Sequence, residues 1–110
     1  MANTELLENV VLELRRGVIM LAALSQLGTE QYGYSLLKQL ADLGLEVDQG
    51  TLYPLLRRLE SQGLLESKWN VEGTRPRRYY ILSLAGREAL SALANEWRNL
   101  TVVMEKLLSQ

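Results

Sequence analysis

Two neighbouring segments of the chain hold the side chains with the clearest chemistry. In Asp48–Leu65, leucines recur on one side of the segment and polar residues on the other, where Arg57 and Arg58 lie. The next segment, 73–80, adds three guanidinium groups, at Arg75, Arg77 and Arg78. A helix beside a cationic ribbon is a common device for binding duplex DNA, with the helix in the major groove and the ribbon on the backbone or in the minor groove. These segments predict double-stranded DNA as the partner.

The chain contains no cysteine and no histidine. Disulfides, thiolate chemistry, the commonest zinc ligands and the commonest general base are therefore excluded. The sequence also has no glycine-rich phosphate loop, and no serine or carboxylate pair lies in a pattern typical of catalysis. We expect no enzymatic activity, no metal and no cofactor.

The formal net charge of −1 conceals a strong segregation of charge. Residues 51–87 contain seven basic and three acidic side chains, a balance of +4, whereas the rest of the chain carries −5. A local cationic face on a nearly neutral chain is compatible with a nucleic-acid partner.

The length and the ends of the chain bound its organisation. A chain of 110 residues is long enough for one domain with a modest core. No apolar run approaches the roughly 20 residues that span a bilayer, and the start Met1–Leu6 lacks the basic region of a signal peptide. We expect a cytoplasmic protein without a membrane partner.

Apolar periodicity predicts three helices in the first part of the chain. The first starts at a cap on Asn3 or Thr4 and runs to about residue 27. After a turn-rich connection over 28–33, the second spans about 34–43, with one apolar face made by Leu36, Leu37, Leu40 and Leu43. The third begins at a cap on Asp48 or Thr51 and ends at Gly63. Its inward face consists of Leu52, Leu55, Leu56 and Leu59.

Two short strands, 65–69 and 78–82, with a loop over 70–76, follow the third helix. Ser83 then caps a long last helix that runs to about Leu108. This order predicts a mainly α fold with a small β-ribbon, namely a winged helix-turn-helix with long N- and C-terminal dimerisation helices. Residues 1–82 form the winged helix with its N-terminal helix, and 83–110 form the C-terminal helix of the same structural unit.

The first and last helices carry more apolar surface than one small winged helix covers. The last helix has a heptad line, and leaving such side chains in water costs roughly 1.5–3 kcal/mol each. A homodimer removes this cost and places two recognition helices about one DNA turn apart, on a palindromic operator. The expected interface consists of Leu7, Val11, Leu90, Leu93, Leu100, Met104 and Leu107.

Three motifs resemble the PadR family of bacterial transcriptional regulators. They are Tyr32-Gly33-Tyr34, the block from Gly50 to Glu60 (GTLYPLLRRLE), and the segment from Arg75 to Tyr80 (RPRRYY). The resemblance covers nearly the whole chain, and the single short last helix is similar to a subgroup that includes multidrug-sensing repressors. It implies a dimeric repressor that releases DNA when a small aromatic or drug-like effector binds.

The resemblance also implies which residues contact DNA. The reading helix would present Gln49, Gly50, Thr51, Tyr53, Pro54, Arg57 and Arg58. The start of the second helix would contact phosphate through Tyr34, Ser35 and Lys38. The wing would add Arg75, Arg77 and Arg78.

Some of these residues have a plain structural alternative. Arg57 and Arg58 could form an ordinary solvated helix face. Tyr53 could contact DNA or support the second helix from a half-buried position. Tyr79 and Tyr80 alternate across the ribbon, so we expect one to pack inward and one outward, both with structural roles.

Trp97 has two interpretations. It could fill the dimer core at a heptad position, or two copies could sandwich a flat aromatic ligand, with the partner's Leu14 and Val18 as apolar walls. A tryptophan here matches the multidrug-binding members of the family. Those members can carry an acid one turn later, where this chain has Thr101, so the residue behind a preference for cationic ligands is missing at that place, although Glu96 and Glu105 are near.

The competing function is a winged helix that contacts only protein or RNA, with arginines that serve solubility. Sequence-specific, salt-dependent binding to DNA separates the two hypotheses.

Overall fold

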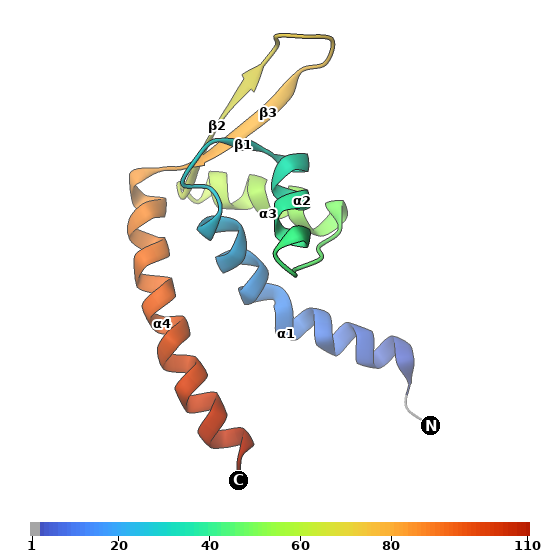
Figure 1. The fold of residues 1–110 in the computed structure, drawn as a ribbon, viewed down its shortest axis with the longest axis vertical. Helices are drawn as coiled ribbons and strands as arrows, with labels where there is room; N and C mark the ends of the chain where they lie inside the picture. Colours follow the sequence, from blue (N-terminus) through green and yellow to red (C-terminus); the bar gives the residue numbers. More distant parts are fainter. Residues whose placement is uncertain (1–2) are drawn as a thin grey trace.

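The computed structural model describes residues 3–110, which form helices around a small antiparallel sheet (Figure 1). The elements are α1 (Thr4–Ser25), β1 (Gln31–Tyr32), α2 (Gly33–Asp42), α3 (Gln49–Ser61), β2 (Leu65–Asn70), β3 (Arg77–Leu82) and α4 (Leu84–Leu108). The mainly helical fold with a small ribbon is confirmed. The first two residues of the unit expected over 1–82 lie outside the described part.

Side-chain caps set the start of both long helices. The Asn3 side chain accepts a hydrogen bond from the backbone N–H of Leu6 at the start of α1, at 3.1 Å. The Ser83 hydroxyl accepts one from the N–H of Gly86 at the start of α4, at 3.0 Å. Each cap satisfies one of the backbone donors that a helix leaves unpaired in its first turn.

The start of α3 decides between the two expected caps. Asp48 is the N-cap, and its carbonyl oxygen accepts hydrogen bonds from the N–H groups of Thr51 and Leu52. The Thr51 hydroxyl in turn donates to the Asp48 carboxylate at 2.6 Å. Pro54 therefore lies inside the helix, where it has no N–H to continue the helical bonding.

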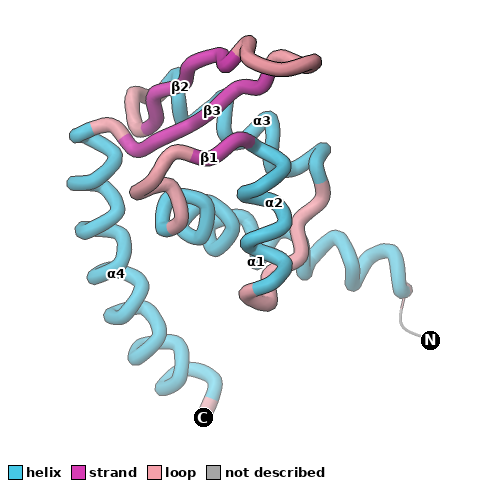
Figure 2. Tube along the Cα trace, turned by 45° about the horizontal axis from the view of Figure 1, so that its top comes forward, coloured by secondary structure: helices cyan, strands magenta, loops and turns pink. Residues whose placement is uncertain are grey.

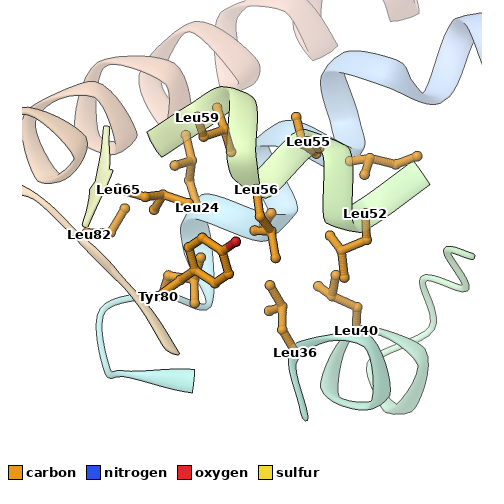
Figure 3. Packing of buried hydrophobic residues seen from close by; sticks show 13 residues of the cluster. Leu24, Leu36, Leu40, Leu52, Leu55, Leu56, Leu59, Leu65, Tyr80 and Leu82 are labelled. Atoms are coloured by element: carbon orange, nitrogen blue, oxygen red, sulfur yellow. The ribbon is translucent and has the colours of Figure 1, made fainter. Parts of the chain in front are cut away.

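The core forms where one face of α3 meets α1, α2 and the sheet (Figure 3). The four expected leucines of α3 are at most 6% exposed. They pack in one cluster with Leu24 of α1, Leu36 and Leu40 of α2, and Tyr80 of β3. Leu43, which the periodicity places on the face of Leu36, is 68% exposed because α2 ends one residue before it.

The sheet contains one strand that the sequence did not predict. β1 pairs antiparallel with β3, so the strand order is β1-β3-β2 (Figure 2). The segment expected as a turn thus contributes an edge strand to the sheet. Tyr32 of β1 lies opposite Tyr79 of β3, and their rings meet edge to face with centroids 5.6 Å apart. Tyr80 is buried and Tyr79 half-buried, as the expected alternation requires.

The first turn of α4 is fixed tightly to the turn that follows α3. The Ser83 hydroxyl donates to the carbonyl of Gly63 at 2.6 Å, and the Ser83 N–H donates to the carbonyl of Leu64 at 3.1 Å. Gly86 lies so close to this turn that a Cβ there would overlap the Leu64 carbonyl oxygen. The orientation of α4 therefore follows that of α3.

Two helical arms leave the body of the molecule. The N-terminal half of α1 and the C-terminal half of α4 extend away from the core in different directions (Figure 1). Both arms expose apolar side chains, which include Leu7, Val11, Leu14, Trp97, Leu100, Met104 and Leu107. None of the helices over residues 3–110 has the length and apolar character needed to cross a membrane.

The close approach at Gly86 gives a stability prediction. We expect Gly86→Ala to lower the free energy of unfolding by about 2 kcal/mol or more, because a backbone carbonyl must move to admit the methyl group. Urea unfolding at fixed protein concentration measures the change. The control is Gly28→Ala, where a Cβ meets nothing within 4 Å and we expect a change within about 0.5 kcal/mol. Equal stability of both variants would contradict the tight docking of α4.

Candidate nucleic-acid interface

A groove of about 890 Å³ runs between α3 and the hairpin of β2 and β3, residues 65–82, which we call the wing. Its floor contains two core side chains, Leu56 and Tyr80. The remaining lining residues come from β1, α2, α3 and the wing: Tyr32, Gly33, Tyr34, Gln49, Tyr53, Arg57, Trp69, Arg75, Pro76, Arg77 and Arg78. The groove thus combines aromatic rings with guanidinium groups and has no carboxylate among its lining residues.

Three of the groove's arginines keep their charge available. Arg57, Arg75 and Arg77 are exposed, and within residues 3–110 none of them forms an ion pair. Arg77 lies over the ring of Tyr32, 4.6 Å from its centroid, which orients the guanidinium group without neutralising it. Side chains of this kind suit phosphate oxygens.

Arg78 differs from the other wing arginines because an acid holds it. Its Nη2 donates to the Glu60 carboxylate of α3 at 2.7 Å, and its Nε donates to the Ser67 hydroxyl at 3.1 Å. Ser67 donates to the other oxygen of Glu60, at 2.5 Å, and closes the triangle. The guanidinium also lies between the rings of Trp69 and Tyr80, 5.7 Å from each centroid. Arg78 therefore connects the wing to α3.

Tyr53 packs on α2 and faces the groove. Its ring lies against Gly33, where a Cβ would be only 2.7 Å from the ring carbon Cε1. Burial raises the pKa of the Tyr53 hydroxyl, and the neighbouring Tyr34 and Tyr32 raise it further. The hydroxyl therefore stays protonated at neutral pH and can donate a hydrogen bond to a phosphate oxygen. Both expected roles of Tyr53, support and contact, fit this position.

The three residues expected at the start of α2 lie in different settings. Tyr34 is exposed and lines the groove, and the ammonium of Lys38 lies 5.8 Å from the centroid of its ring. Ser35 is half-buried, and its hydroxyl donates to the carbonyl of Tyr32 at 2.9 Å. Its role as a phosphate contact remains a prediction.

The structure brings together seven of the residues expected to contact DNA. Those that line the groove are Tyr34, Gln49, Tyr53, Arg57, Arg75, Arg77 and Arg78. The others on α3 are exposed but outside the groove: Gly50, Thr51, Pro54 and Arg58. Trp69 also lines the groove and was not predicted to do so, although its pairing with Arg78 across the expected hairpin indicates this position.

The residues expected at a dimer interface fall into two groups. Leu90 and Leu93 are half-buried against the core of their own chain. Leu7, Val11, Leu100, Met104 and Leu107 are exposed on the arms. Trp97 is 44% exposed on α4, and Leu14 and Val18 of α1 are exposed and half-buried respectively. The half-buried Thr101 donates its hydroxyl to the carbonyl of Arg98 at 2.8 Å.

Comparison with protein families gives one match. The model of the transcriptional regulator PadR-like family matches residues 20–92, which include α2, α3, the wing and the start of α4.

Known proteins are similar over larger or smaller parts of the chain. A transcriptional regulator of Mycobacterium tuberculosis is 47% identical over 62 residues, which are 56% of this chain and 58% of that protein. The chain thus spans less than two thirds of this relative. A PadR family transcriptional regulator of Eggerthella lenta is 46% identical, with a TM-score of 0.86 over 94% of this chain and 93% of that one. A PadR-like regulator of Bacillus cereus is 28% identical, with a TM-score of 0.76 over 89% and 98% of the two chains.

The unpaired wing arginines give a prediction about salt. Removal of one phosphate contact reduces the steepness of log K against log salt by about 0.9. We therefore expect Arg75→Ala with Arg77→Ala to flatten the slope for duplex DNA, because two unpaired charges per chain are removed. Replacing both members of the Arg78–Glu60 pair, as Glu60→Ala with Arg78→Ala, should leave the slope nearly unchanged, because the two charges already neutralise each other. Fluorescence anisotropy at several salt concentrations measures both. An unaltered slope in the variant that lacks Arg75 and Arg77 would show that the wing does not contact the DNA backbone.

The link between the wing and α3 gives a prediction about stability. A double-mutant cycle with Glu60→Ala and Arg78→Ala should give a coupling energy of about 1–2 kcal/mol in urea unfolding, because the pair is partly buried and shares Ser67. The exposed pair Glu13–Arg16 of α1 is the control, with about 0.3 kcal/mol expected. A coupling no larger than that of the control would show that the link does not fix the wing.

Proposed function

The chain belongs to the PadR-like family of transcriptional regulators, and from this we propose that it is a repressor that binds a palindromic operator as a homodimer. Such regulators are not enzymes. The observation that carries the proposal is the groove beside α3, where exposed polar side chains of the helix adjoin unpaired arginines of the wing. We propose that α3 enters the major groove and that the wing contacts the backbone beside it.

The residues of α3 divide into two roles in this proposal. Gln49 and Thr51 lie in the first turn of the helix, where side chains of a recognition helix reach base edges, and the Tyr53 hydroxyl in the second turn can donate to a base edge or to a phosphate oxygen. Arg57 and Arg58 lie farther along and suit phosphate. Lys38 and Tyr34 at the start of α2 add contacts to the DNA backbone. Gly50 and Pro54 lack long side chains and let the surface of α3 approach the DNA closely.

The dimer follows from the apolar arms. Four exposed side chains of α4, namely Trp97, Leu100, Met104 and Leu107, repeat at intervals of 3, 4 and 3 residues. Covering them contributes roughly 1.5–3 kcal/mol for each fully buried side chain. Leu7 and Val11 on α1 offer a matching surface on a second copy, and two-fold pairing of this kind requires a palindromic site.

We also propose that a small-molecule effector, bound near Trp97, releases the protein from DNA. Trp97 lies on the apolar face of α4, and in a dimer two copies of it could hold a flat aromatic molecule between them. Leu14 and Val18 of the partner would close the site, beside Thr101. Without an effector, the same rings would fill the interface. We also propose that the protein acts in the cytoplasm, where its operator lies.

The function is tested by binding to DNA from upstream of the protein's own gene. We expect binding that is tighter than to a random duplex of the same length, and that weakens steeply as salt rises. Equal affinity for both duplexes at every salt concentration would favour instead a winged helix that contacts protein or RNA.

The dimer gives its own prediction. We expect Leu100→Glu with Leu107→Glu to convert the protein to a monomer and to weaken operator binding at least tenfold, because charges cannot enter an apolar interface unpaired. Sedimentation velocity and anisotropy measure the two effects. Leu84→Glu is the matched control, since Leu84 is exposed on the same helix but off the heptad line. A dimer that survives the double change would place the interface elsewhere.

A further inference from the structure

We propose that the groove between α3 and the wing is a second ligand site, which takes a flat aromatic molecule with an anionic group and thereby excludes DNA. This inference rests on the proposed function, because the groove is lined by residues assigned there to DNA contact. It differs from the site at Trp97, which lies on α4, outside the groove.

The size and the walls of the groove suit a small molecule. Its volume of about 890 Å³ lies within the range of ligand sites in proteins, roughly 300–1,000 Å³. One wall carries Tyr34 and Tyr53, the other carries Trp69, and the floor is Leu56 and Tyr80. Trp69 is 61% exposed, although large aromatic side chains contribute most to stability or binding when they are buried. A flat ring between these walls would cover it.

The charges of the groove select the sign of the ligand. Arg57, Arg75 and Arg77 face it without an acidic partner in the described chain, and no Asp or Glu is among the lining residues. Glu60, the partner of Arg78, is already bound to Arg78 and Ser67. The guanidinium groups would thus repel a cation, while a sulfonate or carboxylate would find planar donors for its oxygens.

Occupation of the groove has a direct consequence for DNA. The ligand and a phosphate backbone would use the same guanidinium groups, so their binding is mutually exclusive. The apparent dissociation constant for DNA then rises with ligand concentration without reaching a plateau. An effector at Trp97 acts through a coupling of finite size and gives a plateau instead. The form of this dependence separates the two sites.

Two dyes that differ only in charge test the inference. The probe is 8-anilinonaphthalene-1-sulfonate, and N-phenyl-1-naphthylamine has the same rings without the sulfonate. We expect Arg75→Ala with Arg77→Ala to weaken the sulfonated dye at least fivefold and to change the uncharged dye less than twofold. Arg16→Ala removes an arginine on α1, outside the groove, and should change neither. Circular dichroism confirms that each variant is folded.

The aromatic part of the site is tested separately. Trp69→Leu keeps every charge but removes a stacking surface, and we expect it to weaken the sulfonated dye about fivefold. The chain has two tryptophans, so Trp97→Phe leaves Trp69 as the single reporter. The dye should quench the emission of Trp69, and half-maximal quenching should occur at the dye concentration that half-saturates binding. Equal weakening of both dyes in the arginine variant, or no effect of Trp69→Leu, would overturn the proposal.

Competition completes the experiment and separates its failure from that of the proposed function. Duplex DNA should displace the sulfonated dye, and the DNA dissociation constant should keep rising with dye concentration without a plateau. If the protein binds DNA but the dye stays bound, the groove is not the ligand site, and the proposed function stands. If the protein binds no DNA, the proposed function fails, while the dye and tryptophan measurements still decide whether the groove takes an aromatic anion.

Discussion

The burial of one face of α3 is the constraint on which the interface depends. Four leucines of this helix are removed from water, each worth roughly 1.5–3 kcal/mol, and together they fix the rotation of the helix about its axis. The residues on other sides of the helix, such as Gln49 and Arg57, then have no choice but to face outward. Local packing thus determines which side chains a nucleic acid can meet.

The arginines of the wing illustrate why a count of charges is a poor guide to an interface. Arg78 is bound by Glu60 and contributes geometry, whereas Arg75 and Arg77 remain unpaired and contribute charge. Because salt largely screens charges that are more than about 8 Å apart at physiological ionic strength, a phosphate group would respond to this local set. The net charge of −1 on the whole chain therefore says little about the local charge on the face formed by α3 and the wing.

The sequence predicts features that depend on residues close together in the chain, and it does not predict those that depend on contacts between distant residues. The helices and their caps depend on residues within one or two turns: Ser83 was the predicted cap of the last helix, and Asn3 was one of the two caps left open for the first. β1 has only two residues and exists because β3 lies beside it, so no local pattern indicates it. The bond from Arg78 to Glu60 joins residues 18 positions apart. Its existence follows from the docking of the wing on α3, which a periodic pattern does not encode.

The two long helices, α1 and α4, contact the chain at both ends of α3. Arg15 of α1 donates to the carbonyl of Glu46, just before α3, at 2.6 Å. The first turn of α4 binds the carbonyls of Gly63 and Leu64, just after α3. A change in the angle between α1 and α4 would therefore strain one of these contacts or move α3. In the proposed dimer, such a change would alter the spacing of the two α3 helices, so a molecule bound between the arms would act on DNA without touching it. A molecule in the groove would need no such motion, because it would occupy the surface proposed to contact DNA.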